Sequence, residues 1–322
     1  MQFLSIPEDG QTWQEPLVYR FATGGDEPQD VKVEIYDNET YTLLATKMLY
    51  GVTEAEIDIA PYLRAMYDEA ISVPPKTAIQ LSPMTRYIGV GIGGIMSPQL
   101  RLSASAINLK VPSILSSTPS VQDIEYGDMI LFSFYTPQTA KVVVTTYTTI
   151  TSRRHEYTYS GGFLPLDMVI HTASLASTTV AISVDIYSGT QLFRTLRFNI
   201  VPATNHTQRL YWRNRTGGIE SYSFPSMLRL ATEATIDGFQ TIGGYVSRLN
   251  HSTVRHRLCS AYEPEEELER IAGIIHSPYA YKSVGGRLER VDLDTRTIEY
   301  GSHGELRQVV VEISQRQEGG GL

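Results

Sequence analysis

Short runs in which apolar residues alternate with polar residues constrain the fold of this chain more than any other feature of its sequence. The clearest run has Val180, Ile182, Val184 and Ile186 at every second position and ends at a turn over residues 187–190. A period of two places these side chains on one face of an extended strand. Many such runs, separated by turn residues, are typical of β-sandwiches. We therefore expect a mainly β protein.

The order of these runs occurs twice, and this repetition indicates two tandem sandwiches. The run that begins at Leu17 has a counterpart at Ile130, and similar strands and turns follow each of them. A strand at residues 79–81 belongs to the first repeat in this scheme. We predict two Ig-like β-sandwich domains and then a smaller α+β C-terminal domain, with the boundaries 1–114, 115–202 and 203–322.

One helix is expected in the C-terminal domain, near residues 264–276. Pro264 suits the first turn of a helix, and the three glutamates that follow it favour the positive end of the helix dipole. Leu268, Ile271 and Ile274 fall on one face of that helix. The other runs in this domain are predicted to be strands, and Gly238 is expected to break the one over residues 228–244.

The segment 210–224, LYWRNRTGGIESYSF, predicts a hairpin in which two aromatic strands flank a polar turn. Alternation places Leu210 and Trp212 on one face, and Tyr222 and Phe224 on one face of the return strand. We expect these four residues to form the base of the core of the C-terminal domain. Arg213 would then point away from them, near the turn. The candidate structural or interaction residues are Tyr211, Trp212, Gly217, Gly218, Tyr222 and Phe224.

Charge and composition exclude several classes of function. The formal net charge of -8 argues against a nucleic-acid partner, which requires clustered Lys and Arg. No apolar stretch approaches ~20 residues, so no membrane partner is expected. The N-terminal residues show no signal-peptide pattern, and Cys259 is the only cysteine, so we expect folding in a reducing cytoplasm.

No motif in the sequence predicts an active site, a cofactor site or a metal site. The glycine-rich segment 89–94 lacks the strand-to-helix context of a nucleotide loop, because Pro98 follows it closely. Asp292 and Asp294 resemble part of a calcium loop, but Thr297 stands where that loop requires glycine. We therefore expect a protein that is not an enzyme. A glycan-degrading enzyme stays open as an alternative, since a carboxylate pair is defined by geometry in space.

Aromatic residues are the remaining candidates for contact with partners. Trp13, Tyr36, Tyr41 and Tyr62, together with the aromatic residues of the 210–224 hairpin, have two interpretations. Exposed aromatic rings are enriched at protein interfaces, and they also stack on sugars. The alternative is that these side chains lie in the sandwich cores.

Two segments carry a resemblance to a known group of proteins. Residues 31–64 form a strand–strand pattern that ends in IDIAPYLR, and residues 210–224 follow the pattern W-x-N-x-x-GG-x-x-x-Y-x-F. Both segments resemble uncharacterised structural proteins of phages and prophages from gut bacteria. The resemblance implies a virion component of the tail or adhesion apparatus, assembled in the host cytoplasm into a symmetric homo-oligomer with other virion proteins as partners. The alternative is a carbohydrate-binding, adhesin-like surface module that binds a host-surface glycan.

Overall fold

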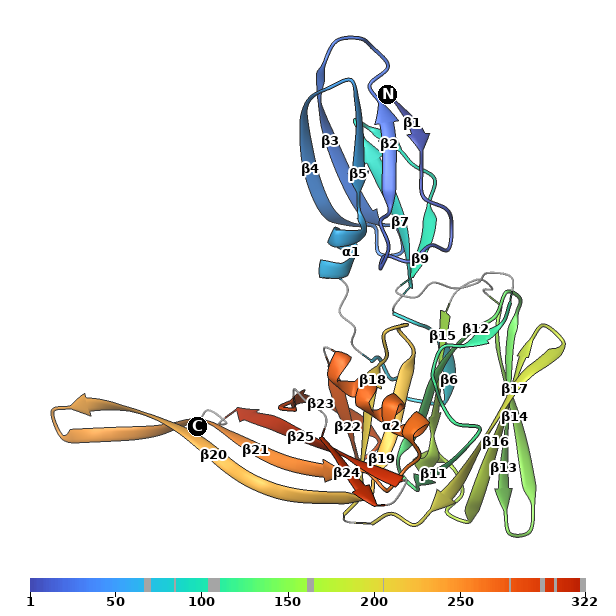
Figure 1. Ribbon diagram of the computed structural model, residues 1–322, viewed down its shortest axis with the longest axis vertical. Coiled ribbons are helices and arrows are strands. Elements are labelled where there is room, and N and C mark those ends of the chain that lie inside the picture. Colours follow the sequence, from blue (N-terminus) through green and yellow to red (C-terminus); the bar gives the residue numbers. More distant parts are fainter. Residues whose placement is uncertain are drawn as a thin grey trace.

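The chain is mainly β, as the alternation predicts, and the strands of its described residues form five sheets (Figure 1). The structure is a computed structural model. It describes residues 1–66, 71–83, 85–103, 111–160, 165–204, 206–277, 279–295, 299–303 and 306–318.

Two sheets near the N-terminus face each other across one hydrophobic core. The alternating residues Tyr19, Phe21, Val31 and Val33 all point into this core and are almost completely buried. A short helix, α1 (Ala60–Met66), follows the last strand of the smaller sheet. The smaller sheet contains β1 (Gln2–Ser5), β2 (Val18–Ala22) and β5 (Glu54–Asp58), and the larger contains β3 (Gln29–Asp37), β4 (Thr42–Val52), β7 (Thr85–Ile92), β8 (Ile95–Met96) and β9 (Leu100–Ser103). We call these sheets the N-terminal sheet pair.

Two further sheets form the middle sheet pair, again with one core between them. Ile182, Val184 and Ile186 are buried in it, as expected, whereas Val180 is exposed because the pairing with the neighbouring strand shifts register there. One sheet contains β10 (Ser113–Ile114), β12 (Met129–Tyr135), β15 (Pro165–His171) and β6 (Ala78–Leu81). The other contains β11 (Val121–Glu125), β17 (Gln191–Val201), β16 (Thr179–Ser188), β13 (Ala140–Thr148) and β14 (Ser152–Tyr159).

Strand β6 joins a different sheet from the one that the sequence suggests. It belongs by sequence to the first repeat, but it pairs antiparallel with β15 at the edge of the middle sheet pair. Ile79 and Leu81 pack against the middle core, and this burial explains the placement. The chain then returns to β7 of the N-terminal sheet pair.

The remaining strands form one C-terminal sheet, which helix α2 (Glu265–Ala272) covers on one face (Figure 1). The helix lies within the predicted range, and the 3-10 turn Gly273–His276 extends it. Its Leu268 and Ile271 are buried against the sheet, as predicted. The strands are β18 (Gln208–Arg213), β19 (Ile219–Phe224), β20 (Ser226–Thr241), β21 (Gly244–Cys259), β22 (Ala280–Val284), β23 (Arg287–Leu293), β24 (Glu299–His303) and β25 (Leu306–Glu318).

The C-terminal sheet lies between α2 and the middle sheet pair, so its first hairpin is covered on both faces. Tyr211 and Ile219 of this hairpin share a small cluster with Met129 and Leu131 of β12. The same arrangement explains why every residue of β12 is buried. Three layers therefore meet here, namely helix, C-terminal sheet and middle sheet pair.

Candidate functional site

The hairpin predicted over residues 210–224 is present as β18 and β19, and its apolar faces coincide. Leu210 lies opposite Tyr222 in the register, and both join Trp212 and Phe224 in the core under α2. Trp212 and Phe224 have no exposed surface. These four residues form the centre of the core of the C-terminal sheet, which is the structural role that the sequence suggests for them.

Arg213 points away from the four-residue apolar face and bonds the turn, where the sequence places it, and its side chain is buried. Its guanidinium group donates to the Asp167 carboxylate at 3.2 Å and to the Gly217 carbonyl at 2.7 Å. The side chains of Arg213 and Asp167 are 1% and 0% exposed, respectively. This face of the hairpin packs on the middle sheet pair, a contact that the sequence pattern does not reveal.

A serine joins this buried ion pair to the hairpin backbone. Ser133 of β12 donates its hydroxyl to Asp167 at 2.6 Å and accepts the backbone N–H of Ile219 at 2.9 Å. Ser116 donates its hydroxyl to the Ile219 carbonyl at 2.5 Å. A buried charge is tolerated when it is paired and its remaining bonds are filled. This network fixes the hairpin in one position on the middle sheet pair.

A second buried carboxylate, Glu220, connects the hairpin to α2 and to the segment 115–120. It accepts the backbone N–H of Ser117 at 2.5 Å and pairs with Arg270 of α2 at 3.3 Å. The side chains of Glu220 and Arg270 are 2% and 5% exposed. Burial raises the pKa of the Glu220 carboxyl, while the bonds from Ser117 and Arg270 oppose that rise.

Tyr211 links the opposite face of β18 to the middle sheet pair. Its hydroxyl donates to the Met129 carbonyl at 2.7 Å and accepts the Met129 backbone N–H at 3.2 Å. Burial raises the pKa of this phenol, so it stays protonated and able to donate. Tyr211 is thus a structural residue at the junction.

The two glycines of the hairpin turn have different requirements. Gly217 has a φ of 77°, a conformation that side chains rarely adopt. Gly218 lies against the segment 115–120, where an added Cβ would come within 2.2 Å of the Leu115 carbonyl oxygen. The turn therefore needs glycine at both positions, once for backbone conformation and once for close approach.

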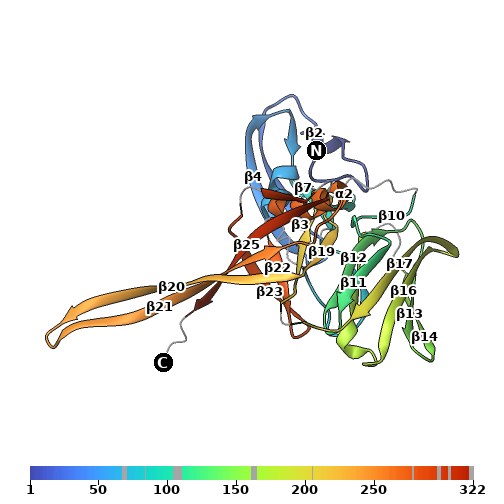
Figure 2. The ribbon, with the colours of Figure 1, turned by 60° about the horizontal axis from the view of Figure 1, so that its bottom comes forward.

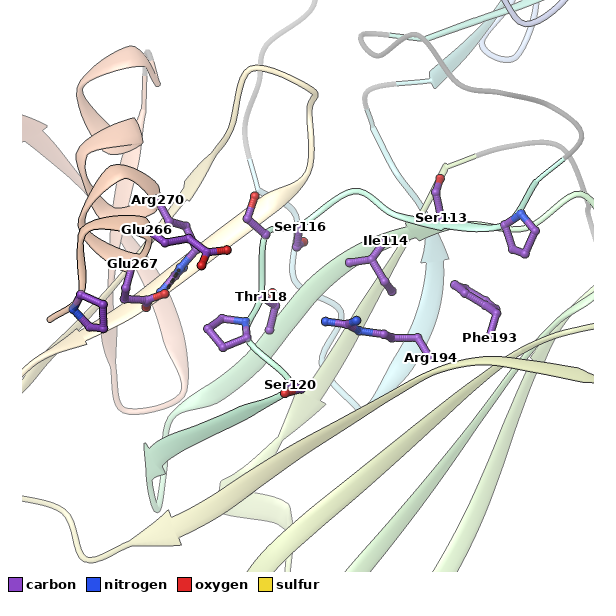
Figure 3. Close-up of a pocket in the computed structure, with 14 residues that line it drawn as sticks. Ser113, Ile114, Ser116, Thr118, Ser120, Phe193, Arg194, Glu266, Glu267 and Arg270 are labelled. Atoms are coloured by element: carbon purple, nitrogen blue, oxygen red, sulfur yellow. Dashed lines mark hydrogen bonds and ion pairs between the residues drawn. The ribbon is translucent and has the colours of Figure 1, made fainter.

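A groove lies where the segment 115–120 separates from β17 (Figure 3). Strands β11 and β17 are parallel partners from Val121 onward, and Arg197 donates its N–H to Ser120. Before that point the segment bends toward the hairpin, where Ser117 and Leu115 are bound. The groove has a volume of about 690 Å³. Its walls carry Ile114, Pro119, Phe193, Arg194, Glu266 and Arg270.

A long hairpin projects from the C-terminal sheet, and the sequence did not predict it. Strands β20 and β21 pair continuously from Ser226 and Cys259 out to Thr241 and Gly244. In the described part of the chain, strand β25 pairs with β21 from His251 inward, and residues 235–250 form a two-stranded ribbon (Figure 2). We call this ribbon the arm. In both views it extends away from the middle sheet pair.

Gly238 does not break strand β20, contrary to the prediction. The aromatic ring of Tyr245 extends across this glycine, and an added Cβ there would lie 1.8 Å from the Tyr245 hydroxyl. A cross-strand aromatic side chain over a glycine stabilises a strand that glycine alone weakens. At the tip of the arm, Ile242 is fully exposed and Tyr245 is 68% exposed.

The other aromatic candidates divide between core and surface. Trp13 is buried in the N-terminal core, so it does not offer a contact surface. Tyr36 and Tyr62 are half-buried, whereas Tyr41 is 88% exposed. The aromatic residues of the 210–224 hairpin are buried on both of its faces.

The segments with weak site motifs have ordinary structural roles. Residues 89–92 complete strand β7, and Gly93 and Gly94 form the turn to β8 with positive φ. Asp294 bonds Ser314 at the end of β23. Within the described residues, no group of three His, Cys, Asp or Glu side chains has the geometry of a metal site. The helices of the described segments are all too short or too polar to cross a bilayer.

The buried network at the junction was missed, although the sequence carries a signal for it. Asp167 stands inside an otherwise apolar strand, and Ser133 interrupts an aromatic one. Polar residues in such positions indicate a buried bond rather than an exposed face. Their partners, Arg213 and the Ile219 backbone, are distant in sequence and become neighbours only in the fold.

Comparison with known proteins adds little to these observations. No family model matches the chain, and no curated protein matches it. Among solved structures, the crystal structure of Dpr2 Ig1-Ig2 in complex with DIP-Theta Ig1-Ig3 is 9% identical over 63% of this chain and 99% of that chain. The TM-score is 0.18, and a likeness of this size carries no argument about fold or function.

Proposed function

We propose that this protein is a non-enzymatic structural subunit that assembles with copies of itself through its arm. The observation that carries the proposal is the projection of residues 235–250 beyond the last strand that supports them. A two-stranded ribbon is marginally stable in water when no third strand or other layer covers it. An arm of this kind gains stability when it packs on another molecule.

The outer edge of the arm supports the same proposal. Strand β20 is the terminal strand in the order of the C-terminal sheet as far as the chain is described. Long unpaired edges are sites at which another chain adds. The exposed Ile242 and Tyr245 place apolar surface at the end of the arm.

The resemblance of residues 31–64 and 210–224 to phage structural proteins gives the proposal its biological setting. The subunit would belong to a virion, in the tail or adhesion apparatus, and form a symmetric homo-oligomer with other virion proteins beside it. The two sheet pairs would be tandem Ig-like sandwich domains, followed by an α+β domain built on the hairpin of β18 and β19. Their separate cores support this division.

Native mass spectrometry across a range of concentrations tests the assembly. The proposal expects the fraction of chain in one closed oligomer to rise with protein concentration. It also expects the chain to be present in purified particles when it is co-expressed with the other virion proteins. A strict monomer at every concentration, with no incorporation into particles, contradicts it.

A glycan-binding surface is a second candidate function, and one feature of the N-terminal sheet pair favours it. The outer face of the larger sheet in this pair carries Tyr50 of β4, which is 72% exposed, and Tyr36 of β3, which extends over Gly91. Aromatic rings on a sheet surface offer flat faces for stacking on sugars. A glycan array tests this candidate, and binding that survives Tyr36→Ala and Tyr50→Ala would contradict the placement.

A further inference from the structure

The groove beside β17 exposes the edge of a strand that has lost its neighbour. The segment 115–120 continues from β11, but the hairpin holds it through bonds from Glu220 to Ser117 and from Asn214 to the Leu115 carbonyl. It therefore leaves β17 before Ser120. Two strands that start side by side open into a fork at this point (Figure 3).

The backbone direction of β17 at the fork follows from its last bond to β11. The N–H of Arg197 faces β11, because it donates to the Ser120 carbonyl at 2.8 Å. Backbone groups alternate sides along a strand, so the N–H and C=O of Thr195 face the same way. They therefore face the side of β17 on which the segment 115–120 no longer runs alongside. An incoming extended chain can pair with them.

The walls of the groove define what such a chain must carry. Ile114 and Phe193 offer apolar surface, and their neighbour Pro119 adds to it. Arg194 provides positive charge on the β17 side, whereas Glu266 provides negative charge on the α2 side, where Glu267 is paired with Arg270. A volume of about 690 Å³ lies within the range of pockets that enclose a ligand, and it suits the tip of a hairpin rather than a whole domain.

The arm carries the complementary features. Its tip exposes Ile242 and Tyr245, which match apolar walls. Behind the tip, Asp237 of β20 pairs in register with Arg248 of β21, so the two strands carry opposite charges at one level. A ribbon with β20 along β17 brings the strand that carries the acidic residue next to β17 and the strand that carries the basic residue next to α2.

We propose that the tip of the arm of one copy occupies the fork between β17, the segment 115–120 and α2 of a neighbouring copy. This inference rests on the proposed function and names the surface that receives the arm. The arm points away from the fork of its own chain in both views, so the contact is between copies. Because the donor and acceptor surfaces differ, the contact is heterologous, and repetition closes a ring or extends a filament.

Site-directed disulfide formation between two different copies tests the contact. Both copies carry Cys259→Ser, which removes the only native cysteine. One copy carries Ile242→Cys, and the other, marked by an affinity tag, carries Ser117→Cys in the groove. The control partner carries Thr158→Cys on the exposed strand β14. The proposal expects at least about tenfold more mixed disulfide with Ser117→Cys than with the control.

A second measurement separates the arm contact from assembly in general. Ile242→Asp is expected to weaken association at least about tenfold, because an apolar anchor becomes charged inside the groove. Ile150→Asp is the matched control, because Ile150 is 89% exposed and lies in the turn between β13 and β14. This change should leave association unchanged. Both variants keep the melting temperature of the wild type, since neither side chain packs in the fold.

The outcomes distinguish this inference from the proposed function. If oligomers form but the disulfide yields for Ser117→Cys and Thr158→Cys are equal, the groove is not the binding site of the arm. The proposed assembly is then unaffected. A loss of association with Ile242→Asp but no disulfide at Ser117 also overturns the groove, since the arm then binds elsewhere. A wild-type chain that stays monomeric and forms no mixed disulfide overturns both.

Discussion

Removing the Asp167 carboxylate should weaken the contact between the C-terminal sheet and the middle sheet pair. Asp167→Ala removes the charged partner of the buried Arg213 guanidinium, which keeps its bond to the Gly217 carbonyl, and it also removes the partner of the Ser133 hydroxyl. The Nε of Arg213 already has no hydrogen-bond partner. Breaking a buried ion pair from one side costs about 3–5 kcal/mol. We expect a loss of stability of that size.

The fluorescence of Trp212 reports this loss of stability, because Trp212 lies in the core of the C-terminal sheet. Trp13 is the only other tryptophan, and Trp13→Phe in the reference protein makes the fluorescence specific to the C-terminal sheet. With a urea dependence of about 2 kcal/mol per M, a cost of 3–5 kcal/mol lowers the midpoint by about 1.5–2.5 M. The exposed pair Arg20–Glu56 is the control, and Glu56→Ala should cost less than about 1 kcal/mol.

A double-mutant cycle then separates the ion pair from the space it fills. Asp167→Leu combined with Arg213→Met replaces both charges with apolar groups, so most of the single-variant loss should be recovered. A single variant that costs less than about 1 kcal/mol, or two losses that simply add, would refute the account of this junction.

Three further changes test the hairpin and its turn. Gly218→Ala should cost about 1–3 kcal/mol, because its Cβ meets the Leu115 carbonyl, whereas Gly25→Ala has open space and should cost little by thermal unfolding. Trp212→Ala should cost about 3–5 kcal/mol in urea, and unchanged stability would place the ring outside the core. Tyr211→Phe leaves both backbone groups of Met129 without the phenol, and a cost below about 0.5 kcal/mol would contradict its linking role.

The alternation in the sequence was enough to predict the mainly β class and many of the core side chains. Period two placed Tyr19, Phe132 and Trp212 inside, and each of them is buried. This works because one face of a strand must leave water wherever two layers pack. The helix over residues 265–272 followed equally well from its capping proline, its acidic first turn and its apolar face.

Partner choice between layers did not follow from alternation. A strand that is buried on both faces, such as β12, is a nearly continuous apolar run, but that run does not say which layer covers each face. For this reason the burial of Arg213 was not expected, and β6 was expected in the first repeat. Both placements depend on contacts between residues far apart in sequence, such as Arg213 with Asp167 and Leu81 with Leu166.

The arm was missed for a local reason. Gly238 weakens a strand by itself, and the residue that compensates for it, Tyr245, lies on the other strand of the hairpin. The tip turn over Ile242 and Gly243 carries no strong signal for a hairpin with long strands. Cross-strand pairs of this kind become visible only when the register is known.

The mass of an arm-shortened chain in solution tests the central claim most directly. Residues 236–250 are replaced by Asn-Gly, a two-residue turn that suits a hairpin and keeps the pairing of Thr235 with His251. The retained strands keep their support from β25. Light scattering after size exclusion should show an oligomer for the wild type and a folded monomer for the shortened chain. An oligomer of unchanged mass in the shortened chain would contradict assembly through the arm.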